Sequence, residues 1–573
     1  MTGIALAVAL GSAGLVAVGT PAAYAVTPSD EAAKLPITSF GAMVVDSAHE
    51  RVYVTDGRKG SGASQVHVYN FQGQKVGSLA TDQPASGMAL SADSATLHVS
   101  TTNRMLTFDT ATQTRSGATY APYDVACGRE MAVAGGKAWF TETPYTDSYC
   151  DQSGNTTSLY GVGNVSNPSA VNTGWSAAGR LRLEAGPEAP DRLVMGQAGA
   201  EEGANPFLTT FDASGDTLVR GPSRRFADAD GKGALDLKDI AQSADGKRIA
   251  VADAAYGTRL LDAGDLTDAP AGYQPLPDGA KASAVAFSGD GKYVARGAVA
   301  AGSTADLLIQ PADPADGTAP LEFAFEGALD GSRIVPQGLG WSRDGSRLFA
   351  VASDGGGNHW LHVIQPPAAQ YDSRFTGALT TTPAQAVVGE PLGIRGKLEL
   401  DGPAPAEPVK VTAVRKDADG TQEVAAAKVA ADGSFTVLDV PDRVGESTYT
   451  LRFLGDVTHR PAEDVTLTVD VAKAPTSIAL TAPAEATRAG GVEITGRLTG
   501  QGRALPSGIS LKVTRTDRFG TTGELTSASV AADGTFRIKD LPSKRGRTVY
   551  AVSYEGDALH SGSSAEATVR VIS

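Results

Sequence analysis

Short apolar runs that open on a polar or basic residue recur seven times over the first two thirds of the 573-residue chain. The last residues of successive runs lie 41 to 56 residues apart, a length that holds four strands and their turns. The runs are Arg51–Val54, Thr96–Val99, Lys137–Phe140, Arg192–Met195, Arg248–Val251, Lys292–Ala295 and Arg347–Ala350. This spacing predicts a β-propeller of seven four-stranded blades.

A turn signal precedes several of these runs. Ser243, Ser288 and Ser342 each begin an S-x-D-G turn, and Ser91 begins a weaker copy that reads S-A-D-S. Asp-Gly between apolar runs favours a tight turn, because glycine accepts positive φ and aspartate bonds its own backbone. Each unit is therefore expected to run strand, turn, strand, loop and third strand, as in RVYVTD, GRKGSGAS and QVHVYN of residues 51–70.

The last unit ends in WLHVIQPP (360–367) without an apparent fourth strand. A propeller closes only when its two ends meet in one sheet. The segment Leu35–Phe40, LPITSF, is expected to supply the missing strand and close the ring.

From about residue 372 a second repeat appears with an offset of 101 residues. Its matched members are Ala430–Gly433 with Ala531–Gly534, Tyr449 with Tyr550, Asp456 with Asp557, and His459 with His560. Many short alternating segments in about 100 residues are typical of a β-sandwich. The repeat predicts two sandwiches, residues 373–472 and 476–573. The short linker between them contains Pro475, which limits bending, so the two sandwiches are expected to form a semi-rigid stalk.

Two family resemblances follow from these motifs. Tyr53-Val54-Thr55-Asp56 and the S-x-D-G turns make residues 33–368 similar to the YVTN-type bacterial β-propeller family. That family, with its lactonase-like and quinoprotein-like relatives, includes both enzymes and binding scaffolds. The pattern Y-x-x-x-[FY]-x-G-D, at Tyr449 and Tyr550, resembles bacterial Ig-like repeat domains of surface proteins. The implied fold class is all-β: a seven-bladed propeller plus two tandem Ig-like sandwiches.

The N-terminus predicts export. Residues 4–19 are apolar and small, and Ala23-Tyr24-Ala25 fits a cleavage site, so residues 1–25 are expected to be a signal peptide. No Lys or Arg precedes the apolar stretch, and a buried helix or an uncleaved anchor remains an alternative. In an oxidising compartment Cys127 and Cys150 are expected to form a disulfide, with two free thiols as the alternative.

The net charge of the chain limits the classes of partner that it is expected to bind. Lys and Arg number 49 against 64 Asp and Glu, so the net charge is 49 − 64 = −15. Nucleic-acid binding, which depends on clustered cations, is excluded, and anionic membrane surfaces are disfavoured. No segment after the signal peptide is long and apolar enough to span a bilayer.

One stretch carries candidate metal chemistry. DADGKGALDLKD (228–239) has the acid spacing of an EF-hand calcium loop, through Asp228, Asp230, Asp236 and Asp239. Lys232 replaces a ligand at position 5, and Asp239 is shorter than the usual glutamate at position 12. The alternative is an interblade loop whose second half continues into a strand. Apart from this weak calcium candidate, no cofactor is expected.

No convincing catalytic set appears, and the repeated histidines favour structural roles. His359 and His362 are three apart in an expected strand, so they face opposite sides and cannot share a metal. The leading hypothesis is a secreted, non-enzymatic recognition or scaffold protein of the bacterial cell surface, whose propeller binds an extracellular protein or glycan. The alternatives are a lactonase-like or quinone-dependent propeller enzyme acting on a small extracellular substrate, and a purely structural envelope component.

Overall fold

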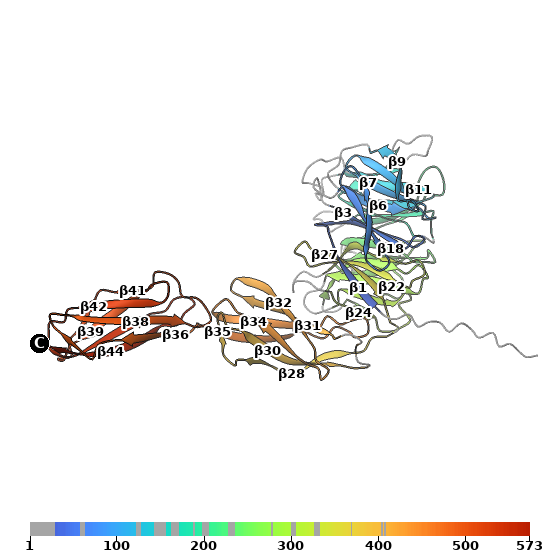
Figure 1. Ribbon diagram of the computed structural model, residues 1–573. Coiled ribbons are helices and arrows are strands. Elements are labelled where there is room, and N and C mark those ends of the chain that lie inside the picture. The colour runs from blue at the N-terminus through green and yellow to red at the C-terminus, as the bar shows by residue number, and fades with distance from the viewer. Residues whose placement is uncertain are drawn as a thin grey trace, which may run out of the picture.

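The computed structural model describes residues 29–57, 64–121, 128–142, 156–161, 171–186, 189–197, 206–226, 235–276, 279–299, 305–325, 333–367, 369–402, 405 and 408–573. Within these ranges the protein is all-β, and it contains no helix with the length and apolar character needed to cross a membrane. A rounded N-terminal head is followed by an extended C-terminal arm (Figure 1).

The head is a β-propeller built from successive antiparallel strand groups. Most groups are four-stranded sheets in sequence order, and two neighbouring groups merge into one larger sheet through the single pair Val299–Arg333. The strands are β2 (Phe40–Asp46), β3 (Arg51–Asp56), β4 (Gln65–Asn70), β5 (Lys75–Ala80); β6 (Ala85–Leu90), β7 (Thr96–Thr101), β8 (Arg104–Asp109), β9 (Thr114–Tyr120); β10 (Met131–Ala134), β11 (Lys137–Glu142), β12 (Thr156–Gly161), β13 (Val171–Ala178); β14 (Leu181–Glu184), β15 (Arg192–Gln197), β16 (Phe207–Asp212), β17 (Val219–Arg225); β18 (Leu237–Gln242), β19 (Arg248–Asp253), β20 (Gly257–Asp262); β21 (Lys281–Phe287), β22 (Tyr293–Val299), β23 (Leu307–Pro311), β24 (Leu321–Phe323); and β25 (Arg333–Trp341), β26 (Leu348–Ser353), β27 (His359–Gln365) with β1 (Ser29–Leu35).

The first strands of these groups form the inner wall of a ring. In the described part of the head, β2, β6, β10, β14, β18, β21 and β25 each lie against the next, and β25 lies against β2. The faces between groups are apolar: one cluster joins Tyr53 and Val66 of the first group to Leu97 and Phe108 of the second. Burying each such side chain stabilises the fold by roughly 1.5–3 kcal/mol, and no group could bury both faces alone.

The S-x-D-G turns form as expected. In the turn at Ser243, the serine hydroxyl donates to Asp245 Oδ1 at 2.7 Å, and the same oxygen accepts the Lys247 N–H at 3.0 Å. These two bonds hold the pKa of Asp245 below its ordinary value. Gly246 follows with φ +66°, the left-handed region that glycine enters without strain. The turns at Ser288 and Ser342 repeat this geometry.

The ring is closed by an N-terminal strand, but not by the expected segment. The strand that pairs antiparallel with β27 is β1, from Ser29–Gln365 to Leu35–His359, so the assignment to Leu35–Phe40 is wrong. β1 is an outer strand in which only Leu35 is buried, and it therefore carries no apolar alternation. Leu35 joins a cluster that links Phe349 of the last group to Val52 of the first.

The arm consists of two similar units, each with two sheets around one core. In the first unit the sheet β28-β30-β33 packs on β29-β35-β34-β31-β32, and in the second β36-β38-β42 packs on β37-β44-β43-β39-β40, with β41 paired to β39. The strands are β28 (Ser373–Thr382), β29 (Ala386–Val387), β30 (Leu392–Leu400), β31 (Lys410–Asp417), β32 (Gly420–Lys428), β33 (Ser434–Asp439), β34 (Gly445–Arg452), β35 (Val465–Ala472), β36 (Thr476–Thr481), β37 (Glu485–Thr487), β38 (Val492–Gly500), β39 (Ser510–Thr516), β40 (Thr522–Glu524), β41 (Ala528–Ser529), β42 (Thr535–Asp540), β43 (Gly546–Tyr554) and β44 (Ser563–Ile572).

The repeated histidines have the same structural role in both units. His459 Nδ1 lies 3.0 Å from Asp456 Oδ1, and its Nε2 lies 3.2 Å from the carbonyl oxygen of Asp401. His560 repeats both contacts in the second unit, with Asp557 and the carbonyl of Arg503. Each buried imidazole therefore ties the Gly-Asp loop to a neighbouring loop at the end of the unit that faces the head.

A buried glutamine joins the head to the arm. The Gln370 side chain accepts the Glu322 N–H at 2.7 Å and donates to the carbonyl oxygens of Glu322, at 3.0 Å, and Asp456, at 3.2 Å. Arg460 of the first unit pairs with the Glu322 carboxylate at 3.4 Å. These bonds connect the last strand of one blade directly to the arm and limit movement at the junction.

Removing β1 should destabilise the propeller. A chain that begins at Pro36 loses the partner of β27 and the buried Leu35, so we expect a loss of at least about 3 kcal/mol of unfolding free energy relative to a chain that begins at Ser29. Thermal and chemical unfolding followed by circular dichroism measure the difference. Identical unfolding curves for the two chains would contradict the closure role of β1.

The S-A-D-S turn holds its serine in an unfavourable conformation. Ser94 has φ +59°, where the other turns use glycine. Ser94→Gly should raise the unfolding free energy by about 0.5–1 kcal/mol, and Gly246→Ser should lower it by about 1 kcal/mol. Chemical denaturation checks both signs; a destabilised Ser94→Gly variant would show that the hydroxyl, rather than the backbone, controls this turn.

Candidate functional site

Two cavities lie along the axis of the strand ring. The wider has a volume of about 880 Å³ and lies where the inner strands begin, at residues such as Phe40 and Lys281; we call it the mouth. The narrower has a volume of about 400 Å³ and is lined by later positions of the same strands, such as Met43 and Val285; we call it the inner cavity. The inner strands thus run from an opening with many charged side chains to a cavity with fewer of them.

A polar bridge crosses the channel where the two cavities meet. Arg182 forms an ion pair with Glu130 and donates to Gln337 Oε1 at 2.9 Å, while Gln337 Nε2 donates to Glu130 Oε2 at 2.7 Å. Glu130 and Gln337 border both cavities. Gln337 comes from β25, which is separated from β10 and β14 by two inner strands either way round the ring. The three side chains therefore join opposite sides of the channel.

The backbone at Gln337 is shaped to make this bridge. β25 carries a register shift between Ile334 and Leu339, and Gln337 within it has φ +59°. A non-glycine residue in this region costs on the order of 1 kcal/mol and persists only where the surroundings hold it. β-bulges at such positions redirect a side chain, here toward the centre of the channel.

Cations dominate the mouth. Six basic side chains and two carboxylates line it among the described residues: Arg129, Arg180, Arg182, Lys238, Lys281 and Arg333 against Glu130 and Asp236. Lys281 and Arg333 are exposed and form no ion pair within the part of the chain that the structure describes. A concave wall with an excess of one charge concentrates ligands of the opposite charge. The mouth is therefore electropositive in a chain of net charge −15.

Arg129 anchors the wall of the mouth. Its guanidinium binds the buried Glu142 carboxylate in a bidentate pair, with Nε–Oε2 at 2.7 Å and Nη2–Oε1 at 3.0 Å. Burial raises the pKa of Glu142, and the Arg129 charge acts against that rise. This fixed geometry, with further bonds to the carbonyls of Thr101 and Thr102, holds the neighbouring Glu130 at the bridge.

Besides Glu130 of the bridge, two further carboxyl side chains, Glu184 and Asp239, line the inner cavity. Asp239 on β18 accepts the N–H of Ile240 at 2.9 Å through Oδ1 and that of Val285 at 3.0 Å through Oδ2. Burial raises its pKa to about 7, against the lowering effect of these bonds. Burial, followed by the charge of Asp239, raises the pKa of Glu184 well above its ordinary value. Such perturbed acids in a cavity are typical of, though not restricted to, functional sites.

The described acids of the predicted calcium loop lie in two different cavities. Asp228 and Asp230 lie outside the described residues, as do Cys127, Cys150 and the expected signal peptide, residues 1–25. Asp236 lines the mouth, where it pairs with Lys238 at 2.8 Å, whereas Asp239 lines the inner cavity from within β18. Among the described residues no three His, Cys, Asp or Glu side chains are grouped to hold a metal ion.

The two neighbouring histidines lie in different surroundings. His359 lines the mouth, and burial lowers its pKa. His362 packs on Phe325, with ring centroids 4.0 Å apart, and its Nδ1 lies 3.3 Å from Asp30 Oδ1 of β1. The pair therefore does not form one site, as the strand period indicates.

Sequence reasoning did not identify the cationic mouth. Its members come from separate blades, and each basic residue by itself is unremarkable on a surface. A signal exists in retrospect, because Lys281 and Arg333 each open an inner strand, and Lys238 and Arg182 hold the second position of theirs. Aligning the repeats on the inner strand would have placed these cations at one end of the ring.

Comparison with known proteins finds a distant structural likeness to a β-propeller. No protein-family model and no curated protein matches the chain. Among solved structures, the β-propeller domain of Cps50 (Swd1) from Myceliophteria thermophila is similar at 14% identity, with a TM-score of 0.39 over 58% of this chain and 98% of that one.

Asp239 should make stability depend on pH. Its pKa rises from 3.8 in an ordinary environment to about 7 in the fold, so the folded chain binds more protons than the unfolded chain between these values. The proton on Asp239 therefore stabilises the fold at low pH, and this contribution is lost as the pH rises toward 7. When the pH is raised from about 5 to about 8, the unfolding free energy of the unchanged protein should fall by on the order of 2 kcal/mol more than that of Asp239→Asn.

Asp245→Asn is the matched control for this measurement. Its turn lowers the pKa of Asp245, so the carboxylate is already ionised throughout this pH range in both states. Chemical denaturation of the three proteins at both pH values gives the comparison. Equal pH dependence in all three would show that Asp239 does not hold its proton in the fold.

Proposed function

We propose that the protein is a secreted, non-enzymatic recognition protein of the bacterial cell surface, whose propeller binds an anionic group of an extracellular protein or glycan at the mouth. The observation that carries the proposal is the excess of cations there, including Lys281 and Arg333. Carboxylate, sulfate or phosphate groups complement this charge, and the arginines offer planar, bidentate donors to them.

The finer assignment of the fold is part of this proposal. The head is a seven-bladed propeller of YVTN type, residues 33–368, and the closing strand β1 extends it to Ser29. The ring of seven inner strands in the described residues supports the blade count. Residues 373–472 and 476–573 are bacterial Ig-like domains that act as a spacer. Their two-sheet cores, with the repeated tyrosine, aspartate and histidine, support this assignment.

Export by the signal peptide of residues 1–25 and a disulfide between Cys127 and Cys150 complete the proposed extracellular form. Their support is the cleavage pattern Ala23-Tyr24-Ala25 and the presence of only two cysteines.

The bridge of Glu130, Arg182 and Gln337 crosses the channel at the inner end of the mouth. An anionic group that enters the mouth meets Arg182, which Glu130 and Gln337 hold in place. Because these partners cross the channel, a bulky ligand stays on the mouth side, and its anionic group competes with Glu130 for the guanidinium. This arrangement favours binding of an extended or protruding anionic segment over passage through the ring.

An enzyme of lactonase-like or quinone-dependent type is the second candidate. The observation that favours it is the pair of acids with raised pKa, Glu184 and Asp239, because a carboxylic acid that keeps its proton near neutral pH can act as a general acid. Hydrolysis of a lactone that is lost in Glu184→Gln but retained in Lys281→Glu would favour this candidate over recognition at the mouth.

Binding of soluble anionic probes tests the recognition proposal. Titration calorimetry of the full chain with hyaluronan oligosaccharides, heparin oligosaccharides and polyglutamate should detect at least one ligand, with affinity that falls as salt rises. Uncharged chitooligosaccharides should not bind. The double variant Lys281→Glu/Arg333→Glu should weaken binding roughly tenfold or more, because it removes two cations and adds two repulsive charges.

The matched control reverses two exposed lysines elsewhere on the head, Lys75→Glu/Lys247→Glu. It changes the net charge equally and should alter affinity less than roughly twofold. Failure of every anionic probe to bind, or equal losses in the two double variants, would overturn the assignment of the mouth as an anion site.

A further inference from the structure

The second unit of the arm ends in three adjoining loops, residues 487–491, 517–521 and 540–547, which we call the distal tip. A Cβ placed on Gly546 would lie 2.7 Å from Arg518 Cδ, and one on Gly491 would lie 3.0 Å from Leu541 Cδ2. The loops therefore touch one another and form one continuous surface. It lies at the end of the arm farthest from the propeller, beside the C-terminus (Figure 1).

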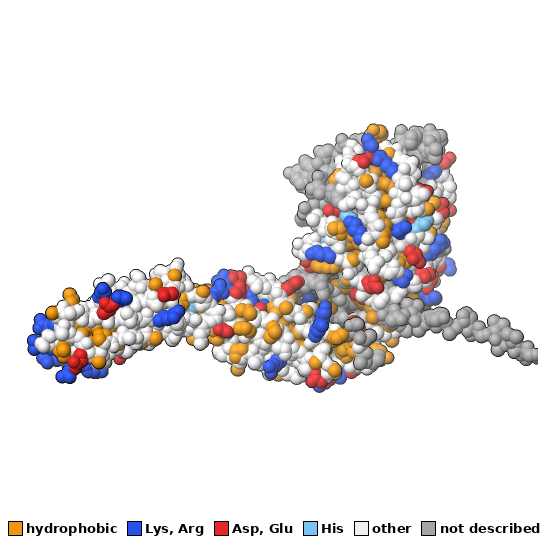
Figure 2. All heavy atoms as spheres, viewed as in Figure 1, with side chains coloured by type: hydrophobic (Ala, Val, Ile, Leu, Met, Phe, Trp, Pro, Cys, Tyr) orange, Lys and Arg blue, Asp and Glu red, His pale blue; other side chains and the backbone are white. Residues whose placement is uncertain are grey.

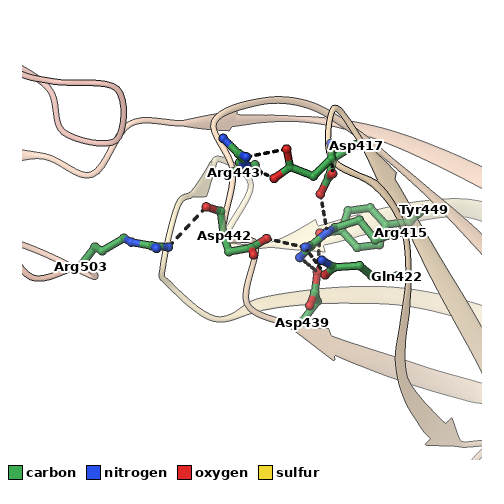
Figure 3. Close-up of polar contacts among 9 residues, drawn as sticks. Arg415, Asp417, Gln422, Asp439, Asp442, Arg443, Tyr449 and Arg503 are labelled. Carbon is green, nitrogen blue, oxygen red and sulfur yellow. Dashed lines mark hydrogen bonds and ion pairs between the residues drawn. The ribbon is translucent and has the colours of Figure 1, made fainter.

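The equivalent end of the first unit is partly covered by the second unit. Arg503 of the second unit donates to the carbonyl of Asp442 at 3.3 Å (Figure 3). Gly389 of the first unit lies against Gly502 of the second. The loops at this end are acidic, and Arg415 binds Asp417 and Asp439 there at 3.0 Å each. In the first unit, this end is the site at which the next unit docks.

The corresponding positions of the distal tip differ in chemistry. The turn D-A-D-G at 417–420 becomes D-R-F-G at 517–520, and the offset of 101 residues replaces Val444 by Arg545 and Glu446 by Arg547. A surface that receives a protein unit in one repeat is thus basic and partly apolar in the other. The difference does not follow from folding, since both units keep the same sheets and core.

Large apolar side chains are exposed among the cations of the tip. Leu541 is 72% exposed and Phe519 66% exposed. Asp517 Oδ1 accepts the N–H groups of Phe519 and Thr521, which fixes the turn, and the Arg518 guanidinium lies 4.4 Å from the centre of the Phe519 ring.

In the described part of the chain, the cations of the tip have no acidic partners. Among the described residues none of the following forms an ion pair: Arg488, Arg518, Lys544, Arg545 and Arg547. Figure 2 shows Lys and Arg gathered at this end of the arm. The two acids of the loops have other partners: Asp540 is bound by Arg515 and the Tyr550 hydroxyl, and Asp517 accepts the N–H groups of Phe519 and Thr521.

We propose that the distal tip docks on a lipid bilayer that contains anionic headgroups. Cations attract such a surface, and exposed Phe and Leu side chains insert at the boundary of headgroups and acyl chains. A soluble polyanion would use the cations but leave Phe519 and Leu541 in water. The net charge of −15 belongs to the whole chain. The tip is locally positive, so it can attract an anionic membrane in spite of that net charge. Docking by the tip holds the propeller away from the membrane at the other end of the arm.

Vesicle co-sedimentation of the full chain tests this docking. We expect binding to vesicles of phosphatidylcholine with phosphatidylglycerol, weaker binding at high salt, and little binding to phosphatidylcholine alone. Arg518→Glu/Lys544→Glu/Arg545→Glu should weaken binding at least roughly tenfold. Phe519→Ser/Leu541→Ser should also weaken it roughly tenfold while leaving the charge unchanged.

The matched control reverses three exposed lysines of the arm outside the tip, Lys410→Glu/Lys428→Glu/Lys512→Glu, and should retain binding within roughly twofold. Unchanged circular dichroism melts establish that each variant is folded. Calorimetry with the soluble probe of the mouth should be unaffected in the tip variants, so this docking and recognition at the mouth can fail independently.

Three results would overturn the proposal. The first is no binding of the unchanged protein to anionic vesicles at low salt. The second is an equal loss in the tip and control variants. The third is undiminished vesicle binding by Phe519→Ser/Leu541→Ser together with tight binding of soluble polyphosphate by the same variant, which would make the tip a polyanion site instead.

Discussion

Closure of the ring is the constraint on which the head depends. Each strand group has two apolar faces and can bury them only between two neighbours, so the stable arrangement is one without a free end. The pairing of β1 with β27 provides this closure, because it places the start of the described chain in the same sheet as the end of the head. The Leu35 cluster then joins the last group to the first across the seam.

The same closure creates the site. In the closed ring, the inner strands all begin at the same end of the central axis. Basic residues from different blades therefore meet there, at the mouth. In the low-dielectric wall of the channel these charges are held by fixed partners, such as Glu142 for Arg129 and Glu130 for Arg182. The inner cavity beyond the bridge favours neutral acids, because burial of Asp239 and Glu184 disfavours their charged forms. One channel therefore contains two electrostatic environments, separated by a strained glutamine.

The arm shows how one structural unit can present different surfaces. Both units keep the Tyr–Asp bond and the buried His–Asp pair that stabilise their ends. Their distal loops, which contribute little to either core, differ in charge, and the exposed Phe519 of the second unit takes the place of Asp419 in the first. Loop residues are free to vary in this way because the sheets, rather than the loops, bury the apolar surface.

The sequence by itself determined the local and periodic features: the strand runs, the S-x-D-G turns, the second half of 228–239 as strand, and the repeat with an offset of 101 residues. These depend on short-range backbone preferences and on the period of apolar side chains, both of which a linear pattern records. Only the tertiary structure decided that the closing strand is Ser29–Leu35, because an exposed outer strand needs pairing partners but no apolar alternation. It also decided the cationic mouth, the Glu130–Arg182–Gln337 bridge and the raised pKa of Asp239. The mouth and the bridge arise from side chains of different blades brought to one axis, and the raised pKa arises from burial of Asp239 inside the ring. Both depend on closure of the ring, which is not recorded in any single stretch of sequence.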